Sequence, residues 1–153
     1  MPKLYMLIGV PASGKSTWLK KNMAPDGVVV SSDDHVERLA AMQGKTYSQA
    51  FKDVAGDATK AMMTDLSDAI AAQKDIYWDQ TNPSKKARAK KLRQVPNNYE
   101  KVAVYFPTPN DEEHQKRLAS RPDKTIPDFV IKSMKSSLQA PSRDEGFDEI
   151  IVA

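Results

Sequence analysis

The chain contains no cysteine and no long apolar run. Without cysteine the protein has no disulfide bond, no thiolate metal site and no cysteine nucleophile. A membrane-spanning helix needs roughly 18 or more consecutive apolar residues, which no stretch supplies. The apolar run at the N-terminus is also too short for a secretory signal peptide. We therefore expect a cytoplasmic protein that does not bind a membrane.

The composition is typical of one globular domain. The chain has 153 residues, of which 40% are hydrophobic and 28% charged. This length suits a single domain with one core, spanning residues 1–153. The formal net charge of +3 permits a nucleic-acid partner but is too small to indicate one. The oligomeric state has no signature in the sequence.

One short motif stands out, at residues 9–16. It reads GVPASGKS and matches the phosphate-binding loop pattern G-x-x-x-x-G-K-[ST] without a gap. A buried-strand pattern at residues 4–8 precedes it and a helix start follows at residue 17, which is the context that the motif requires. Backbone N–H groups of such a loop bind phosphate oxygens, its lysine adds a positive charge, and its serine hydroxyl can bind Mg²⁺. The residues expected to bind the phosphates of ATP are Gly9, Pro11, Ala12, Ser13, Gly14, Lys15, Ser16 and Thr17.

Short apolar runs alternate with amphipathic stretches along the rest of the chain. Strands are predicted at residues 4–8, 28–30, 75–79, 102–106 and 147–152. One helix is predicted to start at residue 17, and a second to follow the strand 28–30 and end near residue 42. Further helices are predicted over 47–73, after Ser84, after Asn110 and over 128–138. This alternation predicts an α/β protein of the P-loop NTPase fold, a small, doubly wound parallel sheet of about five strands with helices on both faces. Ligands of such sheets bind beyond the carboxyl ends of the strands.

Asp33 and Asp34 follow the second predicted strand and are candidates for a catalytic base. A carboxylate near the γ-phosphate can accept the proton of an attacking hydroxyl. Alternatively, these residues cap the helix that begins there, because aspartate is favoured at that position. Arg38 could bind a phosphate of the acceptor, or form a surface ion pair with Asp34 four residues earlier.

Asp79 and Asn82 follow the third predicted strand. Asp79 is expected to hold Mg²⁺ together with Ser16, or else to initiate a turn. Asn82 could orient the acceptor or cap the loop before Pro83. Both interpretations of each residue remain open at this point.

Arg117 and Arg121 are four residues apart and so share one face of a predicted helix. We expect a lid at about residues 115–127 to carry them over the transferring phosphoryl group, whose growing charge they would neutralise. The alternative is a solvated basic face. The basic run from Lys85 to Arg93 presents a similar choice, between a solvated face and contact with a nucleic-acid backbone.

These motifs together resemble the kinase half of bacteriophage polynucleotide kinase–phosphatase and related small P-loop kinases. A counterpart of the phosphatase domain is absent, so no 3′-phosphatase activity is expected. The similarity extends from residue 1 to about residue 138 and rests on the phosphate loop with Thr17-Trp18, on Asp33-Asp34, on residues 79–83 (DQTNP), on Arg117 with Arg121, and on residues 124–127 (KTIP) and 133–134 (SM).

The resemblance implies transfer of the γ-phosphate of ATP to a 5′-hydroxyl of DNA or RNA, with Mg²⁺ as cofactor. It implies that Asp33 is the general base and that Ser16 binds the metal. It also implies that Lys15 stabilises the transition state together with Arg117 and Arg121.

The resemblance further implies that residues 145–150 form the last strand of this kinase class, with Arg143 near the adenine. Two departures concern the acceptor. The family has an arginine three residues after the base, where this chain has Val36, with Arg38 two positions later. The family's Asp-Thr-Asn is replaced by Gln-Thr-Asn at 80–82, and the acid lies one position earlier, at Asp79.

Two other functions therefore stay open. The acceptor could be a nucleotide, a modified DNA base or another small-molecule hydroxyl. The protein could also be a nucleotide-dependent binding module or switch with slow hydrolysis.

Overall fold

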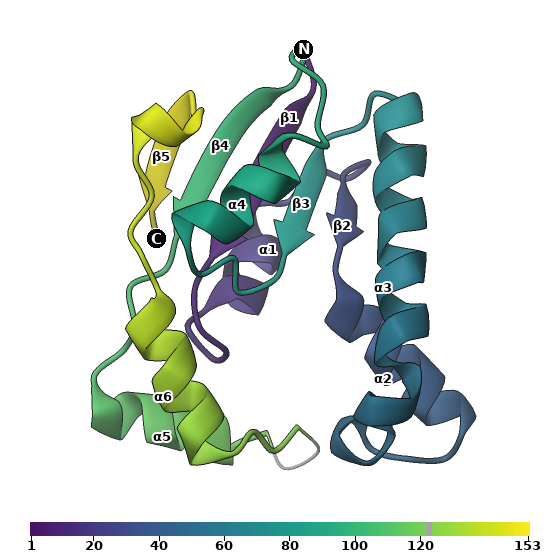
Figure 1. Ribbon diagram of the computed structural model, residues 1–153, viewed down its shortest axis with the longest axis vertical. Coiled ribbons are helices and arrows are strands. Elements are labelled where there is room, and N and C mark those ends of the chain that lie inside the picture. The colour runs from purple at the N-terminus through teal and green to yellow at the C-terminus, as the bar shows by residue number, and fades with distance from the viewer. Residues whose placement is uncertain (122–123) are drawn as a thin grey trace.

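The chain forms one β-sheet flanked by helices, as the computed structural model in Figure 1 shows. The structure describes residues 1–121 and 124–153. The strands are β1 (Lys3–Ile8), β2 (Val28–Val30), β3 (Ile76–Asp79), β4 (Glu100–Tyr105) and β5 (Glu149–Val152). The helices are α1 (Lys15–Asn22), α2 (Ser32–Met42), α3 (Tyr47–Ala71), α4 (Lys85–Leu92), α5 (Asp111–Ala119), α6 (Asp128–Ser137) and the short 3₁₀ helix η1 (Arg143–Glu145).

Within the described residues, the sheet has five strands in the order β2-β3-β1-β4-β5, all paired in parallel. Leu7 of β1 lies opposite Asp79 of β3, and Ile8 lies opposite Tyr105 of β4. The carboxyl ends of the strands therefore lie at one edge, where Gly9 begins the loop that leads into α1. The predicted doubly wound α/β fold is confirmed.

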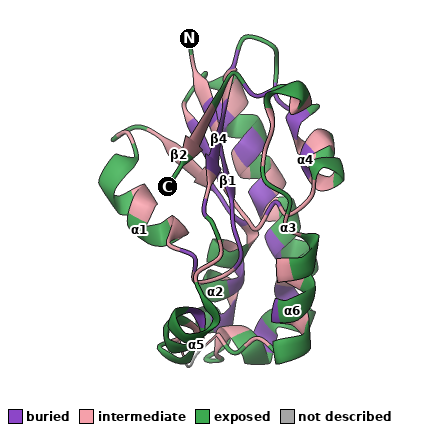
Figure 2. Cartoon of the chain, turned by 90° about the vertical axis from the view of Figure 1, so that its left-hand side faces the viewer, coloured by how far each residue is buried: buried purple, intermediate pink, exposed green. Residues whose placement is uncertain are grey.

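Successive residues of β1 point to opposite faces of the sheet, and helices cover both. Leu4, Met6 and Ile8 lie in the core that α3 and α4 complete. Leu7 lies in a smaller cluster on the other face, against which Trp18 of α1 packs. Figure 2 shows buried residues along β1 and β4 and exposed residues on the outer faces of the helices. Packing on both faces thus holds β1 in place, and with it the start of the phosphate loop that follows this strand.

Side-chain caps fix the starts of α4 and α5 where they were predicted. Ser84 accepts a hydrogen bond from the N–H of Ala87 (3.1 Å), and Asn110 accepts one from the N–H of Glu113 (2.9 Å). Helix α3 continues through Gly56 without a break. No helix in the described part of the chain is long and apolar enough to cross a bilayer.

Candidate functional site

A cleft of about 820 Å³ opens at the carboxyl edge of the sheet. Most of its lining comes from the phosphate loop with the start of α1, the first turns of α2, the end of β3 with the residues after it, and α5 with the residues after it. Phe106 and Pro107 after β4 and Ala153 after β5 complete it. The cleft brings together predicted site residues that are far apart in the sequence. Those that line it are Pro11, Ala12, Ser13, Gly14, Lys15, Ser16, Thr17, Asp33, Asp34, Asp79, Arg117 and Arg121.

The phosphate loop is tightly wound. Ala12 (φ 61°) and Gly14 (φ 109°) both adopt left-handed backbone conformations. The hydroxyl oxygen of Ser13 is buried and has no hydrogen-bond partner among the described residues. A Cβ on Gly9 would lie 2.6 Å from that oxygen, so only glycine fits there. A buried hydroxyl without a protein partner suits a loop whose missing partner is a phosphate oxygen.

Lys15 lies at the centre of this loop. Its ammonium donates hydrogen bonds to the backbone carbonyls of Gly9 (2.8 Å) and Gln80 (3.3 Å). Burial lowers the pKa of Lys15, while the nearby carboxylates of Asp79 and Asp33 act in the opposite direction. A partly desolvated cation held by neutral carbonyls is well placed to bind an anion.

Helix α5 holds the loop from its other side. His114 is buried, and its Nε2 donates a hydrogen bond to the carbonyl of Pro11 (2.8 Å). Arg117 donates from Nη1 to the carbonyl of Ala12 (3.4 Å) and from Nε to Glu113 (3.0 Å). His114 was not among the residues predicted for the site. The available signal was its position three residues before Arg117, which places both on one face of the helix.

The residues after α5 also reach the cleft, which Arg121 and Lys124 line. Lys124 pairs with Glu37 (2.7 Å) and Asp33 (3.6 Å) of α2. This segment therefore connects the phosphate-loop side of the cleft with α2. Residues 122 and 123 of the predicted lid lie outside the described residues.

Asp33 and Asp34 face the cleft in the first turn of α2. The helix cap is Ser31, whose hydroxyl accepts a hydrogen bond from the N–H of Asp34 (3.3 Å), so neither aspartate is needed as the cap. Asp33 accepts a hydrogen bond from the hydroxyl of Tyr47 (2.8 Å), and its side chain is 52% exposed. The pKa of Asp34 is raised, first by partial burial in the cleft and then by the negative charge of Asp79.

Asp79 and Ser16 both line the cleft, together with Lys15. Burial raises the pKa of Asp79, and the charge of Lys15 opposes that shift. Among the described residues no group of three or more histidines, aspartates or glutamates could hold a metal unaided. One carboxylate and one hydroxyl fit Mg²⁺ in the form in which nucleotide enzymes bind it, with the phosphates and water as further ligands.

The structure does not place the two predicted acceptor ligands in the cleft. Arg38 is exposed and donates to Nδ1 of His35 (3.2 Å), and it is not among the residues that line the cleft. Asn82 is 1% exposed and donates to the carbonyl of Leu7 (2.7 Å), so it supports the end of β1. Neither residue is among those that line the cleft, and the acceptor-binding role of both stays a prediction.

Arg143 is also away from the cleft. It lies in η1, before the amino end of β5, whereas the cleft is at the carboxyl ends of the strands. The position near the adenine that the resemblance implied for it does not match this placement. The C-terminal residue Ala153, which follows β5, lines the cleft instead.

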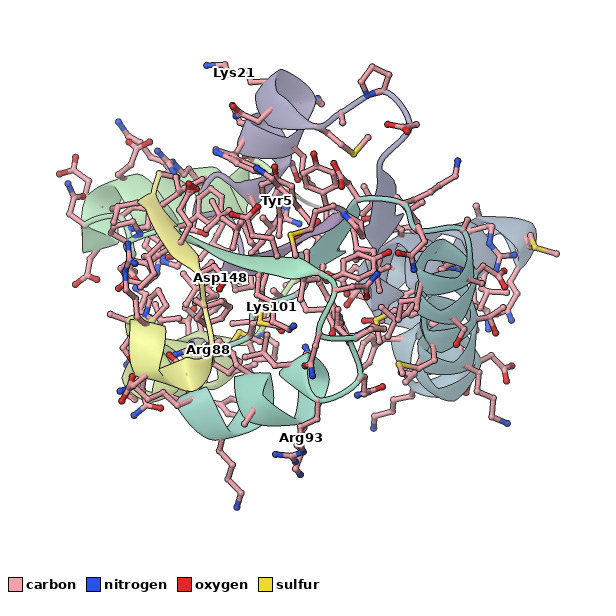
Figure 3. The ribbon with its side chains drawn as sticks, turned by 90° about the horizontal axis from the view of Figure 1, so that it is seen from above. Tyr5, Lys21, Arg88, Arg93, Lys101 and Asp148 are labelled. Atoms are coloured by element: carbon pink, nitrogen blue, oxygen red, sulfur yellow. The ribbon has the colours of Figure 1, made fainter. Side chains whose placement is uncertain are left out.

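The basic run on α4 has two kinds of side chain. Arg88 is fully buried and pairs with Glu145 (2.9 Å), and Lys91 is turned inward. Figure 3 shows the contrast between Arg88, inside the molecule, and Arg93, which projects from its surface. Two of the most internal cations of this run are thus used by the fold itself.

A protein-family model described as an AAA domain matches residues 4–141. This range covers most of the chain, which therefore belongs to that family. With its sheet order and phosphate loop, the domain has the α/β fold of the P-loop kinases.

Solved structures show the same fold in proteins of different activities. A chain of the Pnkp1/Rnl/Hen1 complex is 23% identical, with a TM-score of 0.59 over 75% of this chain and 38% of that one. The PezAT chromosomal toxin–antitoxin system of Streptococcus pneumoniae gives a TM-score of 0.68 at 19% identity, over 99% of this chain and 66% of that one. A gluconokinase from Sinorhizobium meliloti 1021 gives 0.56 at 14% identity, over 99% and 81%.

Proposed function

We propose that the protein is an ATP-dependent kinase that transfers the γ-phosphate to a hydroxyl group, with the 5′-hydroxyl of a polynucleotide as its acceptor. One observation carries the proposal. A phosphate-binding loop, two carboxylates of α2 and two arginines of the α5 region line the same cleft. Phosphoryl transfer needs these three kinds of group together.

The donor half of the cleft would bind the nucleotide. Lys15 and the loop amides would hold the phosphates, and Arg117 and Arg121 would neutralise the charge that grows on the transferred group. Ser16 and Asp79 would hold Mg²⁺, which would offset the negative charge of the phosphates.

Asp33 is the proposed general base. A base must approach the acceptor hydroxyl, and the Asp33 carboxylate is half exposed in the cleft. Its hydrogen bond from Tyr47 and its ion pair with Lys124 would fix its orientation. Asp34, in a less polar setting, would then shape the cleft floor beside Asp79.

A polynucleotide acceptor is supported by the motifs that this chain shares with the phage kinase and by the fold of the Pnkp1 complex chain. The missing arginine at position 36 means that an acceptor phosphate would have to be bound differently. Arg121 is the candidate for that contact, in addition to its role at the transferred group, because it lines the cleft close to Lys124, which contacts α2.

A small uncharged acceptor is the second candidate, and the charge of the cleft favours it. The α2 side carries the three carboxylates of Asp33, Asp34 and Glu37, and Lys124 there is already paired with two of them. An acceptor phosphate would meet this negative charge. The gluconokinase of the same fold acts on a small molecule, as its name states, but that acceptor is a carboxylate, so it supports only the size of the acceptor.

A labelled-acceptor screen tests both candidates. The protein is incubated with γ-labelled ATP and Mg²⁺ and with oligonucleotides that carry a 5′-hydroxyl or a 5′-phosphate, with a nucleoside, with a nucleoside 3′-monophosphate, and with sugars. Label on 5′-hydroxyl oligonucleotides alone supports the first candidate, and label on an uncharged small molecule or an internal base supports the second. Phosphate release without any labelled product contradicts both and leaves a nucleotide-dependent switch.

The matched variants for this screen are Lys15→Ala and Lys20→Ala. Lys15 is the loop lysine, whereas Lys20 is an exposed lysine of the same helix. Transfer should be lost in the first variant and kept in the second. Equal activity of both variants would show that phosphoryl transfer does not depend on the lysine of the phosphate loop.

A further inference from the structure

Lys91 is a partly buried cation outside the cleft that the proposed function does not use. It belongs to α4, yet unlike its exposed neighbour Lys90 it points inward. Its ammonium donates to the side-chain oxygen of Gln80 (2.7 Å) and to that of Asn82, and it lies 5.3 Å from the ring centroid of Trp78. Within the described residues no carboxylate is in ion-pair distance of it. Removing a charge from water without an opposite charge beside it costs free energy, so this cation calls for a structural reason.

The two side chains that Lys91 holds belong to the segment 80–82, which connects the halves of the cleft. The carbonyl of Gln80 accepts a hydrogen bond from the ammonium of Lys15 (3.3 Å), and its side-chain amide donates to the hydroxyl of Ser32 (2.9 Å) at the start of α2. The carbonyl of Thr81 accepts from the N–H of Gly9 (3.1 Å), where the phosphate loop begins. One short segment therefore contacts the phosphate loop, its lysine and the helix that carries the aspartates.

This segment needs support to keep its shape. Asn82 has a φ of 48°, a left-handed conformation that costs free energy for a residue with a side chain. Its amide nitrogen is used by the carbonyl of Leu7 (2.7 Å), and Lys91 supplies the donor for its oxygen. The oxygen of Gln80 is likewise shared between Lys91 and the indole N–H of Trp78 (3.1 Å). Lys91 thus fixes which way both amide side chains point.

We infer that Lys91 is a positioning residue, which holds Gln80 and Asn82 so that the phosphate loop and the start of α2 keep their relative placement, and which adds a positive charge behind Lys15. The part of the inference that concerns nucleotide binding rests on the proposed function. The part that concerns the segment 80–82 does not.

The charge of Lys91 should respond to an anion in the cleft. Burial and then the positive charge of Lys15 lower the pKa of Lys91 to about 8. Both ammonium groups donate to Gln80, one to its side chain and one to its carbonyl. A triphosphate bound at Lys15 would favour the protonated form of Lys91, so binding near pH 8 should take up a proton.

The test compares Lys91→Met with Lys90→Met in the full chain. The methionine at 91 removes the donors and the charge at similar length, and the variant at 90 changes an exposed lysine one position away. Without nucleotide, hydrogen exchange of the Gly9 amide should become at least about tenfold faster in Lys91→Met, because its acceptor segment loosens, and should stay unchanged in Lys90→Met. Equal exchange in both variants would overturn the positioning role, whether or not the protein is a kinase.

Calorimetry with Mg·ATP tests the electrostatic part of the inference, the positive charge that Lys91 adds behind Lys15. The dissociation constant should rise about tenfold in Lys91→Met at pH 7, and wild-type proton uptake at pH 8 should be lost. Loosened exchange with unchanged Mg·ATP binding would overturn the electrostatic role, and no binding by the wild type would overturn that role together with the proposed function. If Lys91→Met does not fold, Lys91→Gln is measured in its place, because it keeps a hydrogen-bond donor without the charge. Proton uptake at pH 8 should be lost in this variant as well.

Discussion

Replacing Lys91 by methionine should change how stability depends on pH. In the folded protein the pKa of Lys91 is lowered to about 8, whereas its ordinary value is 10.5. Between these two values the unfolded chain binds more protons than the folded one, so stability rises with pH there. The cost of the buried charge is present in full below pH 8 and is relieved above it. With these two pKa values, the unfolding free energy of the wild type should increase relative to Lys91→Met by about 1.3 kcal/mol between pH 7 and pH 9.

Urea unfolding of wild type and Lys91→Met, followed by tryptophan fluorescence at pH 7 and at pH 9, gives the gap in unfolding free energy at each pH. The prediction concerns how much that gap changes between the two pH values. Contributions of other titrating groups cancel because both proteins contain them, and the hydrogen bonds lost at both pH values cancel as well. The same comparison for Lys90→Met should give a value near zero. If the gap between wild type and Lys91→Met stays constant from pH 7 to pH 9, or shrinks, then Lys91 is not the desolvated cation described here.

Three further predictions concern the cleft and the chain that supports it. Asp33→Asn should lower single-turnover transfer about 10²- to 10⁴-fold and leave the dissociation constant of Mg·ATP nearly unchanged; full activity in this variant would move the base to the neighbouring aspartate. Replacing Arg117 and Arg121 by alanine should lower kcat more than ATP affinity, and equal losses in steady-state kinetics would make them simple binding residues. Gly9→Ala should destabilise the protein by about 1–3 kcal/mol in thermal unfolding, because the new Cβ has no room. The matched control Gly56→Ala, in open space on a helix, should stabilise it by up to about 1 kcal/mol, and a loss of stability there would contradict the packing argument.

Local signals were sufficient to predict most of the fold. Strand β2 coincides with the predicted run 28–30, and the caps at Ser84 and Asn110 lie where short polar side chains precede a helix. The last strand begins later than predicted, at Glu149, because the N–H of Lys101 donates to the side chain of Asp148 (2.8 Å) and not to the backbone of that residue. Such signals work since they depend on residues only a few positions apart.

The site was predictable only where a motif or a strand end fixed the position. The phosphate loop, Asp33 and Asp79 all meet that condition, and all line the cleft. Asn82 also follows a strand end, but its amide donates to the carbonyl of Leu7, a contact that depends on packing and on its left-handed backbone. Arg38 follows neither a motif nor a strand end, and it contacts His35 of its own helix. Nothing near these two residues in the sequence records that packing.

Lys91 shows the same limit, because its contacts are set by tertiary packing and not by neighbouring residues in the sequence. In the sequence it is one of several cations in a basic run, and it cannot be distinguished there from Lys90. Only the tertiary structure places the side-chain oxygens of Gln80 and Asn82 above it and the ring of Trp78 beside it. Those partners come from β3 and the segment after it, which in turn touches the phosphate loop through Gly9. A residue that acts through another element leaves no local pattern, so the support of this cleft is visible only once its parts are assembled.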